Sequence, residues 1–128
     1  MTTREVISSP NAPAAIGPYS QAIKHGGVLY VSGCIGIEKD LGSLVEGGVA
    51  AQTRQSLINM RHIIEAGGST MSNVLKCTVL LTDMSTYSEV NAVYGEFFPS
   101  EPPARAAFAV SALPAGALVE IECICAAE

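Results

Sequence analysis

Charge, and positive charge above all, is scarce in this sequence. Charged residues make up 15% of its 128 residues, and seven Lys and Arg face twelve Asp and Glu, for a net charge of −5. Soluble domains typically carry roughly 25% charged residues. A nucleic-acid surface needs a dense basic face, so we expect no nucleic-acid partner. A small protein with so little charge exposes apolar surface, which is typical of a partner interface, and we therefore expect a homo-oligomer.

Long apolar runs and targeting segments are also missing. Gly and Pro interrupt the apolar residues before any run reaches membrane-spanning length. The first ten residues, MTTREVISSP, contain neither the apolar segment of a signal peptide nor the Arg- and Ser-rich helix of a transit peptide. We expect a cytoplasmic protein with no membrane partner. The length predicts one domain over residues 1–128.

The cysteines do not form a metal-binding pattern. None of the four belongs to a C-x-x-C motif, and neither histidine lies at zinc-finger spacing from them. We therefore expect buried or free thiols and no metal site. The four are Cys34, Cys77, Cys123 and Cys125.

Hydrophobic periodicity predicts an α+β fold of order β-β-α-β-α-β-β, a mixed sheet with two helices packed on one face. A Gly26-Gly27 turn joins the first two strands, Gly67-Gly68 ends the first helix, and Asp83 or Ser85 caps the second. The predicted strands are 22–25, 28–32, 73–81, 105–110 and 117–125, and the predicted helices are 49–66 and 84–98.

Side-chain spacing predicts which faces are buried. Strand 73–81 is apolar on both faces, so we expect both to be covered. The expected buried stripes of the two helices are Ala50, Thr53, Leu57, Met60 and Ile64, and Tyr87, Val90, Tyr94 and Phe97.

The last two strands carry charge on one face. In 117–125 the apolar set of Val119, Ile121, Cys123 and Cys125 is expected to face the helices, which turns Glu120 and Glu122 away from them. In 105–110 the set of Ala106, Phe108 and Val110 is expected to face the helices, leaving Arg105, Ala107 and Ala109 opposite. If Val110 pairs with Ala117, Ala107 faces Glu120 and Arg105 faces Glu122.

Two interpretations of this face remain open on the pattern alone. Arg105 and Glu122 can form an exposed ion pair, worth about 0–1 kcal/mol. Alternatively, Arg105 binds a ligand carboxylate with two parallel hydrogen bonds, beside a glutamate that handles water. The neighbouring alanines would leave room for a small ligand.

Five segments stand out along the chain: APAAIGPYSQA (12–22), YVSGCIG (30–36), VNAVYGEFF (90–98), PPARAAFAV (102–110) and LVEIECICA (118–126). Together, and in this order, they resemble the RidA (YjgF/Rid) family of reactive-intermediate deaminases, also described as perchloric-acid-soluble translation inhibitors, and its animal members most. The resemblance implies a chorismate-mutase-like fold, assembled as a homotrimer with a central barrel and with active sites in clefts between subunits. It also implies hydrolysis of 2-imino acids and enamines, such as 2-iminobutanoate and 2-iminopropanoate, to 2-keto acids and ammonia without a cofactor.

The same resemblance implies roles for individual residues. Arg105 would bind the substrate carboxylate, Glu120 would position the attacking water and pass a proton, and Tyr19 would close over the ligand and offer its hydroxyl. The remaining positions that match the family's cleft are Ser32, Gly33 and Asn91 in the lining, the backbone of Ala107, and Pro114 at the rim.

Two positions depart from the pattern of many bacterial members. Ala107 stands where those members have cysteine, so no thiol acts there, although the backbone contact survives. Cys34 stands in the SGCIG segment where they have glutamine, and we expect it to be a passive residue of the cleft wall.

Two other functions are weighed beside the deaminase. A ribonuclease or translation inhibitor is disfavoured by the negative charge and by the lack of a histidine pair or basic groove. A non-enzymatic ligand-binding or chaperone-like trimer would tolerate changes at Arg105 and Glu120, which a deaminase would not.

Overall fold

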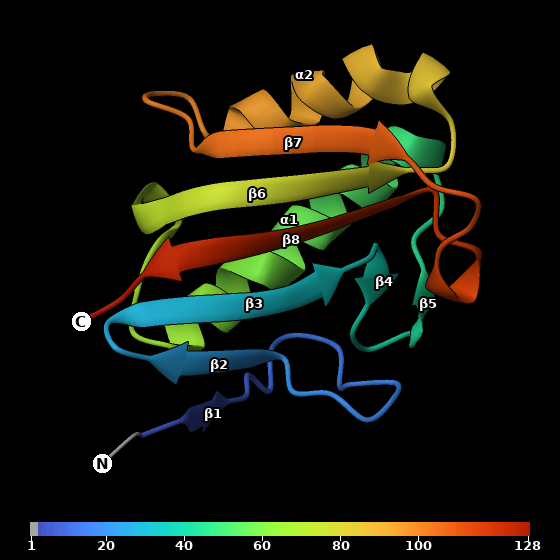
Figure 1. Ribbon diagram of the computed structural model, residues 1–128. Coiled ribbons are helices and arrows are strands. Elements are labelled where there is room, and N and C mark those ends of the chain that lie inside the picture. Colours follow the sequence, from blue (N-terminus) through green and yellow to red (C-terminus); the bar gives the residue numbers. More distant parts are fainter. Residues whose placement is uncertain (1–2) are drawn as a thin grey trace.

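The computed structural model describes residues 3–128, and its main feature is one mixed six-stranded sheet in the order β1-β2-β3-β8-β6-β7 (Figure 1). Two short strands, β4 and β5, form a separate hairpin. The bounds are β1 Glu5–Ile7, β2 Ala22–His25, β3 Val28–Cys34, β4 Ile37–Glu38, β5 Ser43–Leu44, α1 Gly48–Ala66, η1 Met71–Asn73, β6 Val74–Leu81, η2 Met84–Thr86, α2 Tyr87–Phe97, β7 Ala104–Ala109, η3 Pro114–Gly116 and β8 Val119–Ala126, where η marks a 3₁₀ turn.

Several local predictions are confirmed. The β2–β3 hairpin turns at Gly26 and Gly27, whose φ angles of 58° and 77° are those that a tight hairpin turn requires. Helix α1 ends at Gly67, and Gly68 follows in the left-handed conformation, with the Ser69 amide bonded to the Ile64 carbonyl. Asp83 accepts a hydrogen bond from the Ser85 amide at the start of η2.

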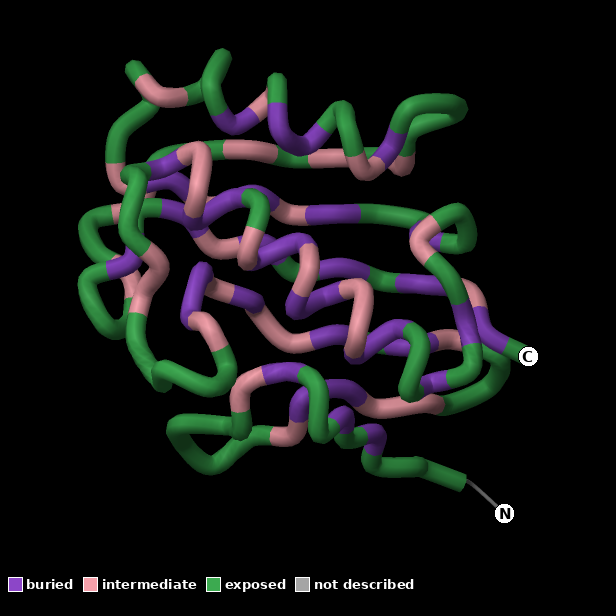
Figure 2. The backbone as a smooth tube through the Cα atoms, turned by 180° about the vertical axis from the view of Figure 1, so that it is seen from behind, coloured by how far each residue is buried: buried purple, intermediate pink, exposed green. Residues whose placement is uncertain are grey.

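Both helices lie on one face of the sheet, as predicted (Figures 1 and 2). Beneath them the predicted inward residues of β8 are buried: Val119, Ile121, Cys123 and Cys125. A bidentate pair between Arg54 of α1 and Glu96 of α2, with N–O distances of 2.9 and 3.1 Å, joins the two helices.

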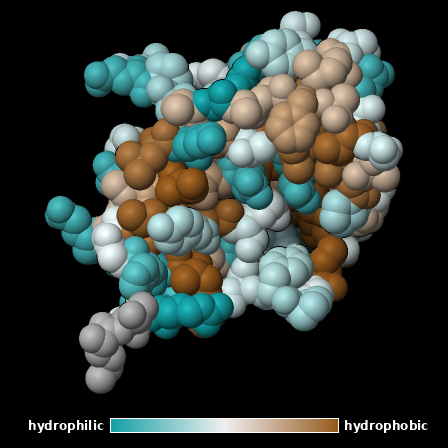
Figure 3. Space-filling model, in the orientation of Figure 1, coloured by the Kyte–Doolittle hydropathy of each residue, from teal (hydrophilic) through white to brown (hydrophobic). Residues whose placement is uncertain are grey.

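The opposite face of the sheet, here called the open face, is not covered by any helix or strand of residues 3–128. The expectation that both faces of 73–81 are covered is not met within one chain, because Leu75 is 51% exposed. Apolar side chains gather on this face, as Figure 3 shows. The exposed large ones from its strands are Val6, Tyr30, Leu75, Phe108 and Ile124.

The predicted pairing of the last two strands is wrong. Strand β6 lies between β7 and β8 and pairs with β7 in parallel and with β8 antiparallel. Arg105 therefore stands beside Cys77 instead of Glu122, and Glu120 stands beside Leu80 instead of Ala107. The short 110–118 connection is not a hairpin loop. It passes the end of β6 and joins β7 on one side of that strand to β8 on the other.

The predicted orientation of β7 is also wrong. Paired residues of neighbouring strands share a face, and the β6 partner of Arg105 is Cys77, which is buried under the helices. Arg105 therefore leaves the sheet on the helix side, whereas Phe108, 49% exposed beside Leu80, lies on the open face with Glu120. The apolar set does not identify the helix side here, because the open face is apolar too.

Smaller differences concern the ends and faces of elements. Strand β1 and the β4–β5 hairpin were not predicted, and the predicted 84–98 helix is split into η2 and α2. Ala50 is only half-buried and Tyr87 is exposed, whereas Val93 is buried in α2. The prediction for the cysteines is confirmed, since all four are buried and unpaired. No helix within residues 3–128 combines the length and apolarity needed to cross a bilayer.

Candidate functional site

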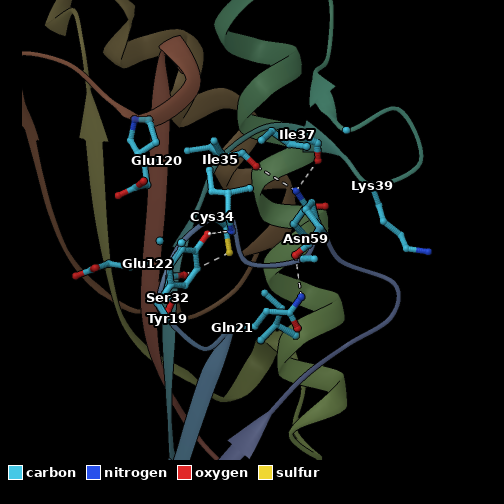
Figure 4. A pocket seen from close by; sticks show the side chains of 18 of the residues that line it. Tyr19, Gln21, Ser32, Cys34, Ile35, Ile37, Lys39, Asn59, Glu120 and Glu122 are labelled. Carbon is cyan, nitrogen blue, oxygen red and sulfur yellow. Dashed lines mark hydrogen bonds between the residues drawn. The ribbon is translucent and has the colours of Figure 1, made fainter.

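A cavity of about 860 Å³ lies beside the end of β3, between the 13–19 loop and α1 (Figure 4). We call it the Glu120 cavity. Figure 4 shows Glu120 and Glu122 projecting from β8 on one side and Lys39 on the opposite side, pointing away. The predicted site residues that line it are Tyr19, Ser32, Gly33, Cys34, Pro114 and Glu120.

The Glu120 carboxylate packs directly against Gly33. A β-carbon placed on Gly33 would lie 2.6 Å from the Glu120 carboxyl carbon and from its Oε2. The register between β3 and β8 shifts by one residue between Val31 and Cys34, which is a β-bulge at this point. The bulge and the missing side chain together admit the carboxylate to the cavity wall.

The environment of Glu120 favours its neutral form. Burial, and next the nearby carboxylate of Glu122, raise the pKa of Glu120 above its ordinary value. A carboxyl group with a raised pKa can exchange protons with a reacting group near neutral pH. Glu120 therefore has the chemistry of a general acid and base.

Ser32 and Tyr19 hold the loop that borders the cavity. The Ser32 Oγ donates to the Ser20 carbonyl at 2.6 Å, and the Ser32 amide donates to the Gln21 carbonyl. The Tyr19 hydroxyl accepts from the Ile16 amide at 3.2 Å within its own loop. That hydroxyl keeps its own proton, so it can still donate to a ligand.

Cys34 lies in the cavity wall with its thiol protonated. Burial, and next the charge of Glu120, raise the pKa of the thiol to about 12. The Sγ atom lies 3.5 Å from the Ser32 carbonyl, to which it donates. A thiol is a weak nucleophile when it is not ionised, which agrees with a passive wall residue.

Asn59 of α1 lines the cavity, and the sequence analysis missed it together with two polar residues of the same helix, Ser56 and Gln52, that hold neighbouring backbone. Asn59 Nδ2 donates to the Ile35 and Ile37 carbonyls at 3.1 and 2.9 Å. Ser56 Oγ donates to the Cys34 carbonyl at 2.5 Å, and Gln52 Oε1 accepts from the Leu118 amide at 2.9 Å. Their spacing of four and three residues, beside the apolar stripe, is a signal that could have revealed them.

The other predicted site residues lie apart from this cavity. Arg105 reaches toward α2, where its Nη2 donates to the Tyr87 hydroxyl at 2.8 Å. Asn91, on the same helix, has a buried Oδ1 atom with no hydrogen-bond partner, and Ala107 packs against the edge of the core. The structure thus gathers one group around Glu120 and a second around Arg105, on opposite faces of the sheet. No cluster of potential metal ligands occurs within residues 3–128.

The chain is similar to known proteins over nearly its whole length. Residues 9–127 match the family described as Endoribonuclease L-PSP. The curated 2-iminobutanoate/2-iminopropanoate deaminases of Bos taurus and Homo sapiens are 50% and 49% identical over 121 residues, covering 94% of this chain and 88% of each relative. The crystal structure of RidA from an Antarctic Psychrobacter superposes with a TM-score of 0.92 at 42% identity, covering 95% of this chain and 98% of that one.

Proposed function

This chain belongs to the Endoribonuclease L-PSP family, to which the RidA deaminases belong, and from that premise we propose that it hydrolyses 2-imino acids and their enamine tautomers. The products are a 2-keto acid and ammonia, so the enzyme is a hydrolase acting on C=N bonds. The relatives named for 2-iminobutanoate and 2-iminopropanoate support these two substrates. One observation carries the proposal. The Glu120 carboxyl group, whose pKa is raised, packs against Gly33 in the wall of a cavity.

The chemistry needs a positioned water and little else. The carboxylate form of Glu120 takes a proton from water as the oxygen attacks the imine carbon, and a C–O bond replaces the C=N π bond. Glu120 then returns the proton to nitrogen, and the C–N bond breaks as the carbonyl forms and the hydroxyl proton passes back to the Glu120 carboxylate. The departing ammonia takes up that proton and leaves as ammonium, which restores the carboxylate. A protonated imine is already electrophilic, so the step consumes only water and requires no cofactor. Such acid–base help is worth roughly 10²–10⁴-fold in rate.

The substrate carboxylate needs a cation, and we assign that role to Arg105. Because Arg105 and Glu120 lie on opposite faces of one chain, a complete site takes Arg105 and Asn91 from one subunit and the Glu120 cavity from its neighbour. Tyr19, Ser32, Gly33 and Pro114 complete the cavity half, and the Ala107 backbone the arginine half. The uncovered apolar open face supports a homotrimer in which the three sheets meet.

The test couples purified protein to a threonine dehydratase and follows the disappearance of 2-iminobutanoate. Wild type should accelerate it, while Arg105→Ala and Glu120→Gln should each lose about 100-fold or more of the acceleration. Glu5→Gln makes the same carboxylate-to-amide change at an exposed position of β1 and serves as the control. A folded wild-type protein that gives no acceleration would contradict the deaminase and favour a ligand-binding or chaperone-like protein.

A further inference from the structure

Arg105 is held by aromatic groups and has no acidic partner. Its guanidinium carbon lies 4.8 Å from the ring centre of Tyr94 and 5.5 Å from that of Tyr87, whose hydroxyl accepts from Nη2 at 2.8 Å. The salt bridges found within residues 3–128 all join other residues. Arg105 is therefore a half-buried cation that no carboxylate of its own chain neutralises. Such a cation favours a bound anion.

The two tyrosines come from one face of α2. Tyr87, Asn91 and Tyr94 follow at spacings of four and three residues, so they lie in a row along the helix. The Cα atoms of the two tyrosines are two turns apart, about 10 Å along the axis, but the guanidinium carbon lies within 5.5 Å of both ring centres. The guanidinium lies between them, beside the turn that carries Asn91. Contact with a ring on each side restricts its movement along the helix, and the Tyr87 hydroxyl restricts its rotation.

We propose that Tyr87 and Tyr94 are positioning residues that orient the Arg105 guanidinium toward the substrate carboxylate. This inference rests on the proposed function and extends it by identifying what sets the orientation of the carboxylate-binding group. One of the five guanidinium donors is engaged by Tyr87, and the others remain for the carboxylate. A side chain held in place before binding loses less conformational entropy when the ligand arrives, so the tyrosines should strengthen substrate binding.

Two substitutions separate the contributions of hydroxyl and ring. Tyr87→Phe removes the hydrogen bond and keeps the ring, whereas Tyr87→Leu removes both. Ser88→Ala is the matched control, because it removes a hydroxyl from the next, exposed position of α2. Calorimetry would measure binding of 2-oxobutanoate, a stable keto acid with the same carboxylate, and of 2-oxobutanamide, which lacks the charge.

We expect Tyr87→Phe to weaken 2-oxobutanoate binding about fivefold and Tyr87→Leu about 20-fold. The affinity of the Tyr87 variants for 2-oxobutanamide should change less than about twofold, and so should the affinity of the Ser88→Ala protein for 2-oxobutanoate. Melting temperatures should show that each variant is folded. In the deaminase assay the tyrosine variants should raise KM with kcat nearly unchanged, because the carboxylate contact is made equally in ground and transition states. Tyr87→Phe should add little loss in an Arg105→Lys background, since the two residues act as a unit.

Different failures point to different errors. If both Tyr87 variants bind 2-oxobutanoate like wild type while Arg105→Ala does not bind it, the positioning role is wrong and the deaminase proposal stands. Equal weakening of acid and amide by Tyr87→Leu would also overturn the positioning role, because it indicates a general disturbance of the site. If Arg105→Ala itself binds and turns over normally, Arg105 has no carboxylate role, and both that part of the proposed function and this inference are wrong.

Discussion

Gly33 is the residue on which the seating of the Glu120 carboxylate depends. The atoms that a β-carbon would meet belong to the mobile end of the Glu120 side chain, so the protein can accommodate alanine by moving the carboxylate. The cost should therefore appear in catalysis more than in folding. A displacement of about 1 Å in a catalytic group can cost on the order of 100-fold in rate.

Gly33→Ala is thus expected to lower kcat about 100-fold while changing the unfolding free energy by less than about 1 kcal/mol. Steady-state kinetics and urea denaturation would measure the two effects. Gly95→Ala is the matched control, since a β-carbon on that exposed α2 residue meets nothing within 4 Å and alanine favours a helix by about 1 kcal/mol. Full activity in Gly33→Ala would show that the position of the carboxylate is not critical.

Glu122 influences the titration of Glu120 through its charge. In the proposed mechanism Glu120 acts first as a base, so activity should fall as pH drops through its pKa. Replacing Glu122 with Gln removes the second cause of that raised pKa and leaves burial, the larger cause, in place. The pKa of Glu120 should then fall, and the acidic limb of the kcat/KM profile should move to lower pH without returning to that of a free glutamate. A limb that stays in place or moves to higher pH would contradict this coupling.

At the scale of elements, α1 acts as a polar wall as well as a core helix. Asn59 donates to the carbonyl of Ile35, which follows β3, and to that of Ile37, the first residue of β4, and both residues line the Glu120 cavity. These hydrogen bonds hold the chain after β3 in place, where the next strand, β4, is only two residues long.

Asn59→Leu keeps the approximate size of the side chain but leaves both carbonyls without a donor. Each lost hydrogen bond costs about 1–3 kcal/mol, so the loss of two should lower the unfolding free energy by about 2–6 kcal/mol in urea denaturation. Arg54→Leu, on the exposed side of the same helix, should cost less than about 1 kcal/mol. A loss at Asn59 no larger than that at Arg54 would show that water replaces the amide.

Elements with local signals were predictable, and those set by long-range pairing were not. The pairs Gly26-Gly27 and Gly67-Gly68 are recognisable as turns because glycine readily adopts the positive φ angles found at Gly26, Gly27 and Gly68. Which strand pairs with β7 depends instead on the crossover connection through α2, which returns the chain parallel to β6. No local sequence pattern encodes that choice. The cavity half of the site followed from the resemblance, whereas the placement of Arg105 failed because both faces of β7 look equally apolar.

For the molecule as a whole, the proposed division of the site between subunits would make activity a property of the assembly. In a protein refolded from equal amounts of inactive Arg105→Ala and Glu120→Gln chains, some clefts receive the intact arginine from one parent and the intact glutamate from the other. Each cleft draws one residue from each of two subunits, so about one quarter of wild-type activity should return. Each variant refolded alone should stay inactive. If the mixed assemblies recover no activity, Arg105 and Glu120 of each site must come from the same chain.

The open face provides an independent test of assembly. Phe108→Asp places a charge at the 49% exposed apolar position beside Leu80 and should reduce the mass measured by light scattering at micromolar concentration. Leu41→Asp, in the loop between β4 and β5, is the control and should leave the mass unchanged. A wild-type protein with the mass of one chain would remove the shared site.

The proposed shared site would also give concentration a regulatory role. In that arrangement a correctly folded but isolated chain holds two incomplete halves that cannot reach each other, so a newly made copy would be chemically silent until it meets others. Output should then rise more steeply than the amount of protein while copies are rare, and become proportional once assembly is complete. The cell would obtain a threshold from geometry alone, with no inhibitor, modification or moving part.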